Sequence, residues 1–161
     1  MSPTSRRIVP VPLFALSMLL LASLGSAQVA HGQKSSGEKN EDKPLYVEYK
    51  GIRIGMETTE VRQKLGDPAD KSDAQDFFVF SEKESAQIFY NKGKVIAVSA
   101  NYVGNNSGAP LARVVFGTDI EAKPDGSMHK IVRYPTAGYW VSYNRTRGDD
   151  PLVTVTMQKI Q

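Results

Sequence analysis

From residue 77 onward, apolar and polar residues alternate in several short runs, a pattern typical of strands with one buried and one exposed side. The predicted strands are residues 77–80, 86–91, 94–102, 130–134, 138–145 and 152–160. Lys92 and Gly93 separate the second run from the third, and a two-residue connection of this kind favours a tight hairpin turn. The pattern therefore predicts an antiparallel sheet.

The residues before the first strand have helical spacing instead. Val61 and Leu65, within the segment 56–65, are four positions apart and lie on one face of a helix. Gly66 suits the left-handed residue that follows a helix, and Pro68 prevents the helix from continuing. The sequence predicts a short helix with a well-defined end.

A second short helix is predicted between Pro110 and Gly117, before another polar loop and three further strands. The two halves, about 51–104 and 107–161, thus share one order of elements. We expect an α+β fold in which two tandem units, each a short helix followed by a three-stranded antiparallel meander, form one sheet of about six strands with the helices on one face. The expected domain spans residues 45–161.

The N-terminal segment 1–27 has the three parts of a secretory signal peptide. Arg6 and Arg7 supply the positive region, Leu13–Leu24 is an apolar run of 12 residues, and small residues precede a cleavage site near Ala27. The alternative is an uncleaved membrane anchor, but this run is shorter than the roughly 20 residues that span a bilayer. We expect a periplasmic or secreted protein.

The segment 28–44 is polar and charged, and it has too few apolar residues to repay the entropy of ordering, so it is expected to be a disordered leader. His31 lies in it and is expected to be solvated. From residue 28 onward there are 18 Lys and Arg (the 20 of the whole chain less Arg6 and Arg7) against 17 Asp and Glu. No basic stripe is present, so no nucleic-acid partner is expected.

The chain has no cysteine, which excludes disulfides, thiolate metal sites, a cysteine nucleophile and a lipid-modified cysteine. We therefore expect no lipid anchor, and only indirect association with a membrane.

Motifs that carry catalysis are absent from the sequence. There is no phosphate-binding glycine loop, metal-ligand spacing or nucleophile elbow. His129 is the single histidine of the expected domain, and a structural role is favoured over a catalytic one. Asp73, Asp76 and Asp149–Asp150 fit no calcium-loop spacing. We expect no enzyme, no catalytic residues, no metal and no cofactor.

The side of the sheet away from the helices is the remaining candidate site. Alternation places aromatic and neutral polar residues on it, as on many protein-binding surfaces. The candidate partner-binding residues are Phe89, Asn91, Asn101, Trp140, Ser142, Asn144, Thr154, Thr156 and Gln158, and Gln87 and Ser99 are expected on the same side. Alternatively, Trp140 and Phe89 pack against the leader or a loop. The leading hypothesis is a non-enzymatic protein that binds another envelope or secreted protein; the alternative is a small-ligand or cell-wall-binding module.

The segment Gly55–Pro68 has the spacing G-M-x-x-x-E-V-x-x-x-L-G-x-P, and the later Tyr90–Val95 reads YNKGKV. These motifs resemble the small outer-membrane lipoprotein family, which includes the E component of the outer-membrane β-barrel assembly machine. The β-lactamase inhibitor protein shares that fold and has two units in tandem. The resemblance covers residues 51–102 and implies a fold rather than a function. Glu57 stands where the family usually has Ser or Thr, and the missing cysteine favours the soluble, inhibitor-like tandem arrangement.

Overall fold

The computed structural model describes residues 43–161, which all lie within one compact unit of the chain. The expected signal peptide over 1–27, His31 and the leader up to residue 42 lie outside the described residues.

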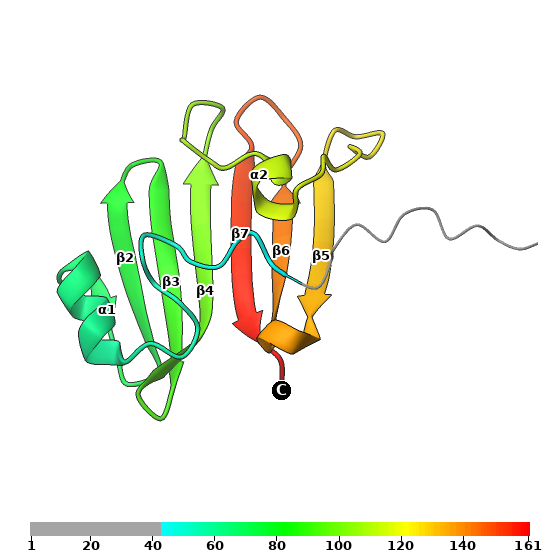
Figure 1. Ribbon diagram of the computed structural model, residues 1–161. Coiled ribbons are helices and arrows are strands. Elements are labelled where there is room, and N and C mark those ends of the chain that lie inside the picture. The colour runs from blue at the N-terminus through cyan, green and yellow to red at the C-terminus, as the bar shows by residue number, and fades with distance from the viewer. Residues whose placement is uncertain (1–42) are drawn as a thin grey trace, which may run out of the picture. The chain divides into compact units, whose positions relative to one another are not determined.

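In the described part of the chain, seven antiparallel strands form one sheet, in the order β1-β2-β3-β4-β7-β6-β5 (Figure 1). Their bounds are β1 (Asp70–Lys71), β2 (Gln75–Ser81), β3 (Glu84–Asn91), β4 (Lys94–Val103), β5 (Met128–Tyr134), β6 (Tyr139–Arg145) and β7 (Leu152–Lys159). The helices are short: α1 (Thr58–Leu65), α2 (Ala112–Phe116) and a 3-10 turn, η1 (Pro135–Ala137). The fold is therefore mostly sheet, and the prediction of a single antiparallel sheet is confirmed.

The two halves of the chain meet in the middle of the sheet, where β4 pairs with β7. On either side of this pair, neighbouring strands continue the sheet: β3 pairs with β4 and β2 with β3 in one half, and β6 pairs with β7 and β5 with β6 in the other. The sheet has one strand more than the six expected, because Asp70 and Lys71 pair with Phe77 and Asp76 at the β2 edge. These polar residues carry no alternating pattern, and the sequence indicated a loop there.

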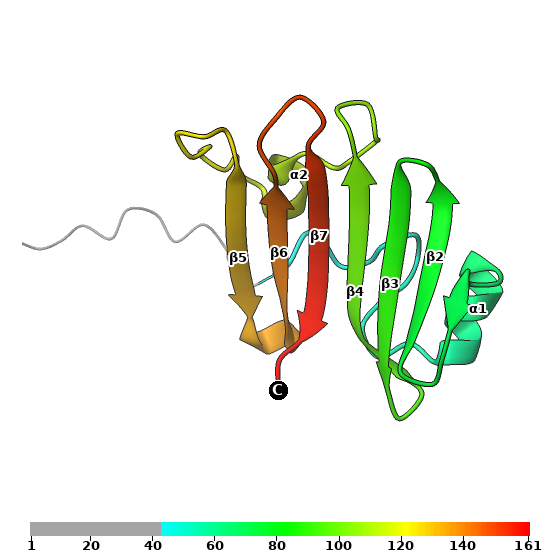
Figure 2. The same ribbon diagram turned by 180° about the vertical axis from the view of Figure 1, so that it is seen from behind.

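One face of the sheet is covered and holds the core. In Figure 1, α2 and the segment that leads from residue 43 lie in front of the strands, and α1 lies beside the β2 edge. Figure 2 shows the opposite face, with α2 and this segment behind the strands. The central strands contribute fully buried side chains that include Ile88, Val98, Val141, Val155 and Met157. Val61 of α1, Val115 of α2 and Ile52 of the leading segment are also fully buried, so each covering element inserts apolar side chains into this core.

Positive backbone φ angles mark the β3–β4 turn and the ends of both helices. Lys92 and Gly93 both have positive φ, 50° and 74°, as a two-residue hairpin of the mirror-image type I requires. Gly117 ends α2 in the left-handed conformation, with φ of 73° and ψ of 1°. Gly66 ends α1 with a positive φ of 85°, but its ψ of −160° lies outside the predicted left-handed helical region. Strict alternation along the predicted strand 94–102 would place Val95 on the same side as Ala97. However, the pairing register shifts after Phe89, so that Val95 faces the core and is fully buried.

Candidate functional site

The face away from the helices is a continuous surface, which we call the open face. Residues paired across an antiparallel sheet project to the same side, so the strand register defines rows that run from β2 to β5. One row is Val79, Ser85, Asn101, Thr154, Asn144 and His129; the next is Phe77, Gln87, Ser99, Thr156, Ser142 and Ile131; the third is Gln75, Phe89, Ala97, Gln158, Trp140 and Arg133.

Polar side chains in the middle of the open face bond to one another across the strands. The hydroxyls of Ser99 and Thr156 lie 3.0 Å apart, and the Thr154 hydroxyl donates to Oδ1 of Asn101 at 2.8 Å. These pairs join β4 to β7, the two strands through which the halves of the chain meet. The middle of the face is therefore an ordered, uncharged polar strip.

Apolar side chains flank this strip on both sides. On the β2–β3 side lie Phe77, Val79 and Phe89, and on the β6–β5 side lie Trp140 and Ile131. Val79 is 57% exposed and Ile131 is 52% exposed, while the three aromatic rings are half-buried. Large apolar groups in contact with water on two sides of a polar centre are a feature that folding alone does not require.

Charge is confined to the two edges of the open face. In the three rows, Arg133 on β5 is the single residue of the Asp, Glu, Lys or Arg types. Asp70 on β1 is paired with Phe77 and so extends the middle row at the opposite edge. Depletion of charge at the centre with charge at the rim is the composition of protein interfaces.

The structure brings eight of the nine candidate residues together in the rows of this face. The residues in the rows are Phe89, Asn101, Trp140, Ser142, Asn144, Thr154, Thr156 and Gln158. Ser142 is only 5% exposed between its neighbours. Asn91 lies beyond the rows at the end of β3, where it borders a hollow together with Gln158. Sequence reasoning missed four residues that β2 and β5 add to the open face: Phe77, Val79, Ile131 and Arg133. The face to which these side chains project depends on how β2 and β5 pair with the neighbouring strands.

His129 belongs to the open face. Its ring nitrogen Nδ1 is hydrogen-bonded to Oδ1 of Asn144 on the neighbouring strand, and the histidine is exposed. Within residues 43–161, no group of three or more histidines and carboxylates is arranged to hold a metal ion.

A buried polar cluster lies on the other side of the sheet and was missed by sequence reasoning. Asp76 is completely buried and accepts hydrogen bonds from Arg62 and from the Tyr90 hydroxyl at 2.7 Å. Burial, the largest single influence, raises the pKa of Asp76, but the bonds from Arg62 and Tyr90 together hold this pKa below its ordinary value of 3.8. Arg62 also donates to the carbonyl of Ser72. All four partners are engaged with one another, so the cluster is structural.

A second polar cluster surrounds Glu84. The Tyr49 hydroxyl donates to Glu84 at 2.9 Å, and the Lys50 ammonium lies 3.1 Å from the same carboxylate and 4.7 Å from the centre of the Phe80 ring. Burial and the bond to Glu84 raise the pKa of Tyr49 far above its ordinary value of 10.0. This cluster ties the segment before α1 to β3 and has no free acid or base.

None of the helices between residues 43 and 161 is long and apolar enough to cross a membrane. Comparisons of the chain with models of protein families, with curated proteins and with solved structures each found no match.

Proposed function

We propose that this is a non-enzymatic, exported protein that binds another envelope or secreted protein through the open face. The observation that carries the proposal is the face itself: apolar side chains on both sides of an ordered polar strip, with charge only at the edges. Such a face gains free energy when a partner removes its apolar groups from water.

Trp140 and Phe89 are the proposed anchors of binding. Tryptophan and other large aromatic residues dominate the energetics of interfaces because each ring buries a large apolar area with few rotatable bonds. The two rings lie in the same row, on opposite sides of β4 and β7. Hydrogen-bonding groups that select the partner lie between and beside the two rings. They belong to Asn91, Asn101, Ser142, Asn144, Thr154, Thr156 and Gln158.

The chemistry of the face also describes the partner. It is expected to present apolar side chains to the two flanks, neutral polar groups to the strip and a carboxylate near Arg133. A cation opposite Asp70 would match the other edge. Because Arg133 and Asp70 stand at the rim, they contribute more to the rate and orientation of association than to its free energy.

The proposed ancestry of the chain is a tandem duplication of a helix-plus-meander unit, with an α+β layout related to the small outer-membrane lipoprotein family and the β-lactamase inhibitor protein. Each half places one short helix before its hairpins, and the last strands of the halves, β4 and β7, pair antiparallel. This arrangement is the one expected if two copies of the unit are related by a two-fold rotation. It supports duplication independently of the thin sequence identity.

Crosslinking and pull-down from an extract of the producing cells, with the full chain as bait, tests the proposed function. We expect Trp140→Ala and Phe89→Ala each to reduce the recovered partner. Val114→Ala is the matched control, because Val114 is a 60% exposed valine on α2, on the side of the sheet opposite the open face. Equal recovery with all three variants contradicts the proposal, and recovery of glycan in place of protein supports the cell-wall-binding alternative.

A further inference from the structure

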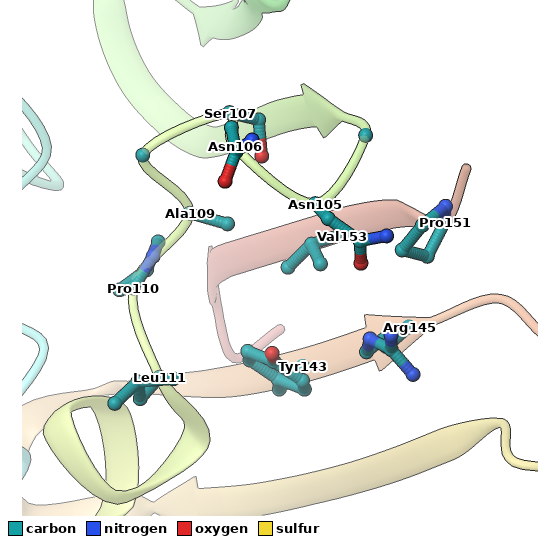
Figure 3. Close-up of a pocket in the computed structure, with 12 residues that line it drawn as sticks. Asn105, Asn106, Ser107, Ala109, Pro110, Leu111, Tyr143, Arg145, Pro151 and Val153 are labelled. Atoms are coloured by element: carbon teal, nitrogen blue, oxygen red, sulfur yellow. The ribbon is translucent and has the colours of Figure 1, made fainter. Parts of the chain in front are cut away.

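A hollow of about 540 Å³ opens at the end of the covered face, between the strands β6 and β7 and the segment that joins β4 to α2. Figure 3 shows Tyr143 and Arg145 on β6, Val153 on β7, and the segment carrying Asn105 to Leu111 passing beside them. This volume lies within the range of about 300–1,000 Å³ that small-molecule sites occupy. The proposed interface does not use these residues, since Tyr143 and Arg145 project from the opposite side of β6 to Trp140 and Asn144.

Among the residues of 43–161 that line the hollow, Arg145 is the one with a charge. Its side chain is half-buried, and its hydrogen bond to the Gly126 carbonyl is long, 3.4 Å from Nη1 to the oxygen. Among residues 43–161 it forms no ion pair with a carboxylate. A partly desolvated cation without a counter-charge is unfavourable unless something else balances it. Its planar fork matches a carboxylate or phosphate in two parallel hydrogen bonds.

The remaining walls combine an apolar side with a polar side. Leu111 and Val153 supply aliphatic surface, together with Ala109, Pro110 and Pro151. The polar side has the amide of Asn106, the hydroxyl of Ser107 and the phenol of Tyr143. An inorganic anion would contact only the polar side and leave the aliphatic wall exposed to water. An organic anion would contact the polar side with its charged group and the aliphatic wall with its apolar part.

The loop that forms one wall is held in place without a ligand. Asn105 donates from Nδ2 to the Asp149 carbonyl, and the Gly104 amide donates to the Pro151 carbonyl at 2.9 Å. Gly104 has a φ of +83°, a left-handed backbone conformation that glycine adopts without strain and that other residues rarely adopt. The walls are therefore pre-formed, which lowers the entropy cost of binding.

We propose that this hollow is a binding site for a small organic carboxylate with a short apolar body. The carboxylate is held by the Arg145 guanidinium, and the apolar body lies against Leu111 and Val153. The proposal is independent of the proposed interface, and either can fail without the other.

Amide chemical shifts of the isotope-labelled full chain, titrated with sodium hexanoate, test this site. Hexanol is the matched neutral probe, and inorganic phosphate is the matched anion without an apolar body. Arg145→Gln removes the charge, Arg145→Lys keeps the charge without the fork, and Arg147→Gln removes a nearby arginine that does not line the hollow. The amide spectrum of each variant also shows whether it is folded.

We expect hexanoate to cause saturable shifts in residues 104–111, and Arg145→Gln to weaken the binding about tenfold or more, as the loss of a charge-assisted pair predicts. Arg145→Lys should retain part of the affinity and Arg147→Gln nearly all of it. The site is disproved if hexanoate causes no saturable shift of these amides, or if folded Arg145→Gln binds it as the wild type does. Binding of hexanol or phosphate as tight as that of hexanoate likewise overturns the proposed ligand class.

Discussion

The guanidinium of Arg62 on α1 donates two hydrogen bonds to the carboxylate of Asp76 on β2, 2.9 Å from Nε to Oδ2 and 2.8 Å from Nη2 to Oδ1. Asp76 is fully buried, whereas the Arg62 side chain is 31% exposed. The pair therefore fastens α1 to the sheet. It also places the charge of Asp76 in the core, where this charge is stable only while Arg62 is bound to it.

Loss of Arg62 should destabilise the fold strongly. Arg62→Met leaves the carboxylate of Asp76 buried with only the Tyr90 hydroxyl and backbone groups as partners, and breaking a buried ion pair from one side costs roughly 3–5 kcal/mol. The free energy of unfolding, measured by urea denaturation, should fall by about that amount.

The chain offers a matched control in the ion pair of Arg53 with Glu48, whose side chains are 65% and 39% exposed. Exposed pairs of this kind contribute about 0–1 kcal/mol, so Arg53→Met should leave the urea midpoint nearly unchanged. Equal, small effects of the two substitutions would show that the pair of Arg62 with Asp76 is not required for stability.

Acid should remove the contribution of the Asp76 carboxylate to the free energy of unfolding. The pKa of Asp76 is lower in the folded state than the ordinary value of 3.8 that the unfolded chain has. The unfolded chain therefore binds more protons in this range, and the free energy of unfolding rises with pH. The stabilisation is complete above about pH 4 and disappears as the pH falls through the folded pKa.

Urea denaturation of the wild type and of Asp76→Asn, each measured at about pH 5 and about pH 3, checks this expectation. The wild type should lose more free energy of unfolding between the two values than the variant, which has no carboxylate at this position. Parallel losses would mean that other carboxylates account for the acid sensitivity.

Alkali should unfold the protein in one step with ionisation of its tyrosines. Burial, followed by the charge of Glu84, raises the pKa of Tyr102 to about 12, and burial raises the pKa of Tyr46 and Tyr90 further. Because the folded pKa lies above the unfolded value of 10.0, this stabilisation is complete below about pH 10 and is lost as the pH rises toward 12.

Tyrosinate absorbance and circular dichroism, followed together during an alkaline titration, measure this coupling. We expect little tyrosinate near pH 10 and a simultaneous change in both signals above it. Tyrosinate that forms near pH 10 while the circular dichroism stays native would contradict the burial of these hydroxyls.

Local pattern predicted the strands, because the period-two alternation of residues such as Tyr139 to Asn144 is a property of neighbouring positions. It also predicted the hairpin at Lys92 and Gly93. The pairing of β4 with β7 could not be predicted, since the two strands are separated by most of the second half and no local signal selects the partner. The shift that buries Val95 escaped the same reasoning, because a bulge changes the side of a residue without changing the sequence pattern.

The candidate site was predictable to the same extent. Alternation placed Trp140 and Asn144 on one side of a strand, and the structure confirms that they share the open face. It could not place Ile131 or Phe77 there, because their strands join the face only through the order of the sheet. The pair of Arg62 with Asp76 gave no signal either, since Asp76 lies in an acidic stretch that resembles a solvated loop.

Truncation of a side chain to alanine should destabilise the fold far less on the open face than on the covered face. Two neighbouring pairs of residues allow a direct comparison. Trp140 pairs with Gln158 on the open face, and Val141 pairs with Met157 in the core, where both are fully buried. Met157→Ala should lower the free energy of unfolding by about 2–5 kcal/mol, because it leaves a cavity. Trp140→Ala removes cross-strand contacts only and should cost about 1 kcal/mol or less.

Urea denaturation of the two variants, and acrylamide quenching of Trp140, the single tryptophan of the chain, measure these differences. Efficient quenching together with a small cost of Trp140→Ala would mean that the ring meets solvent in the free protein, as an interface anchor must. A cost for Trp140→Ala as large as that for Met157→Ala would instead assign the ring to the structural core, and the proposed interface would lose its principal residue. Since the comparison needs no knowledge of the partner, it can be made before the partner is found.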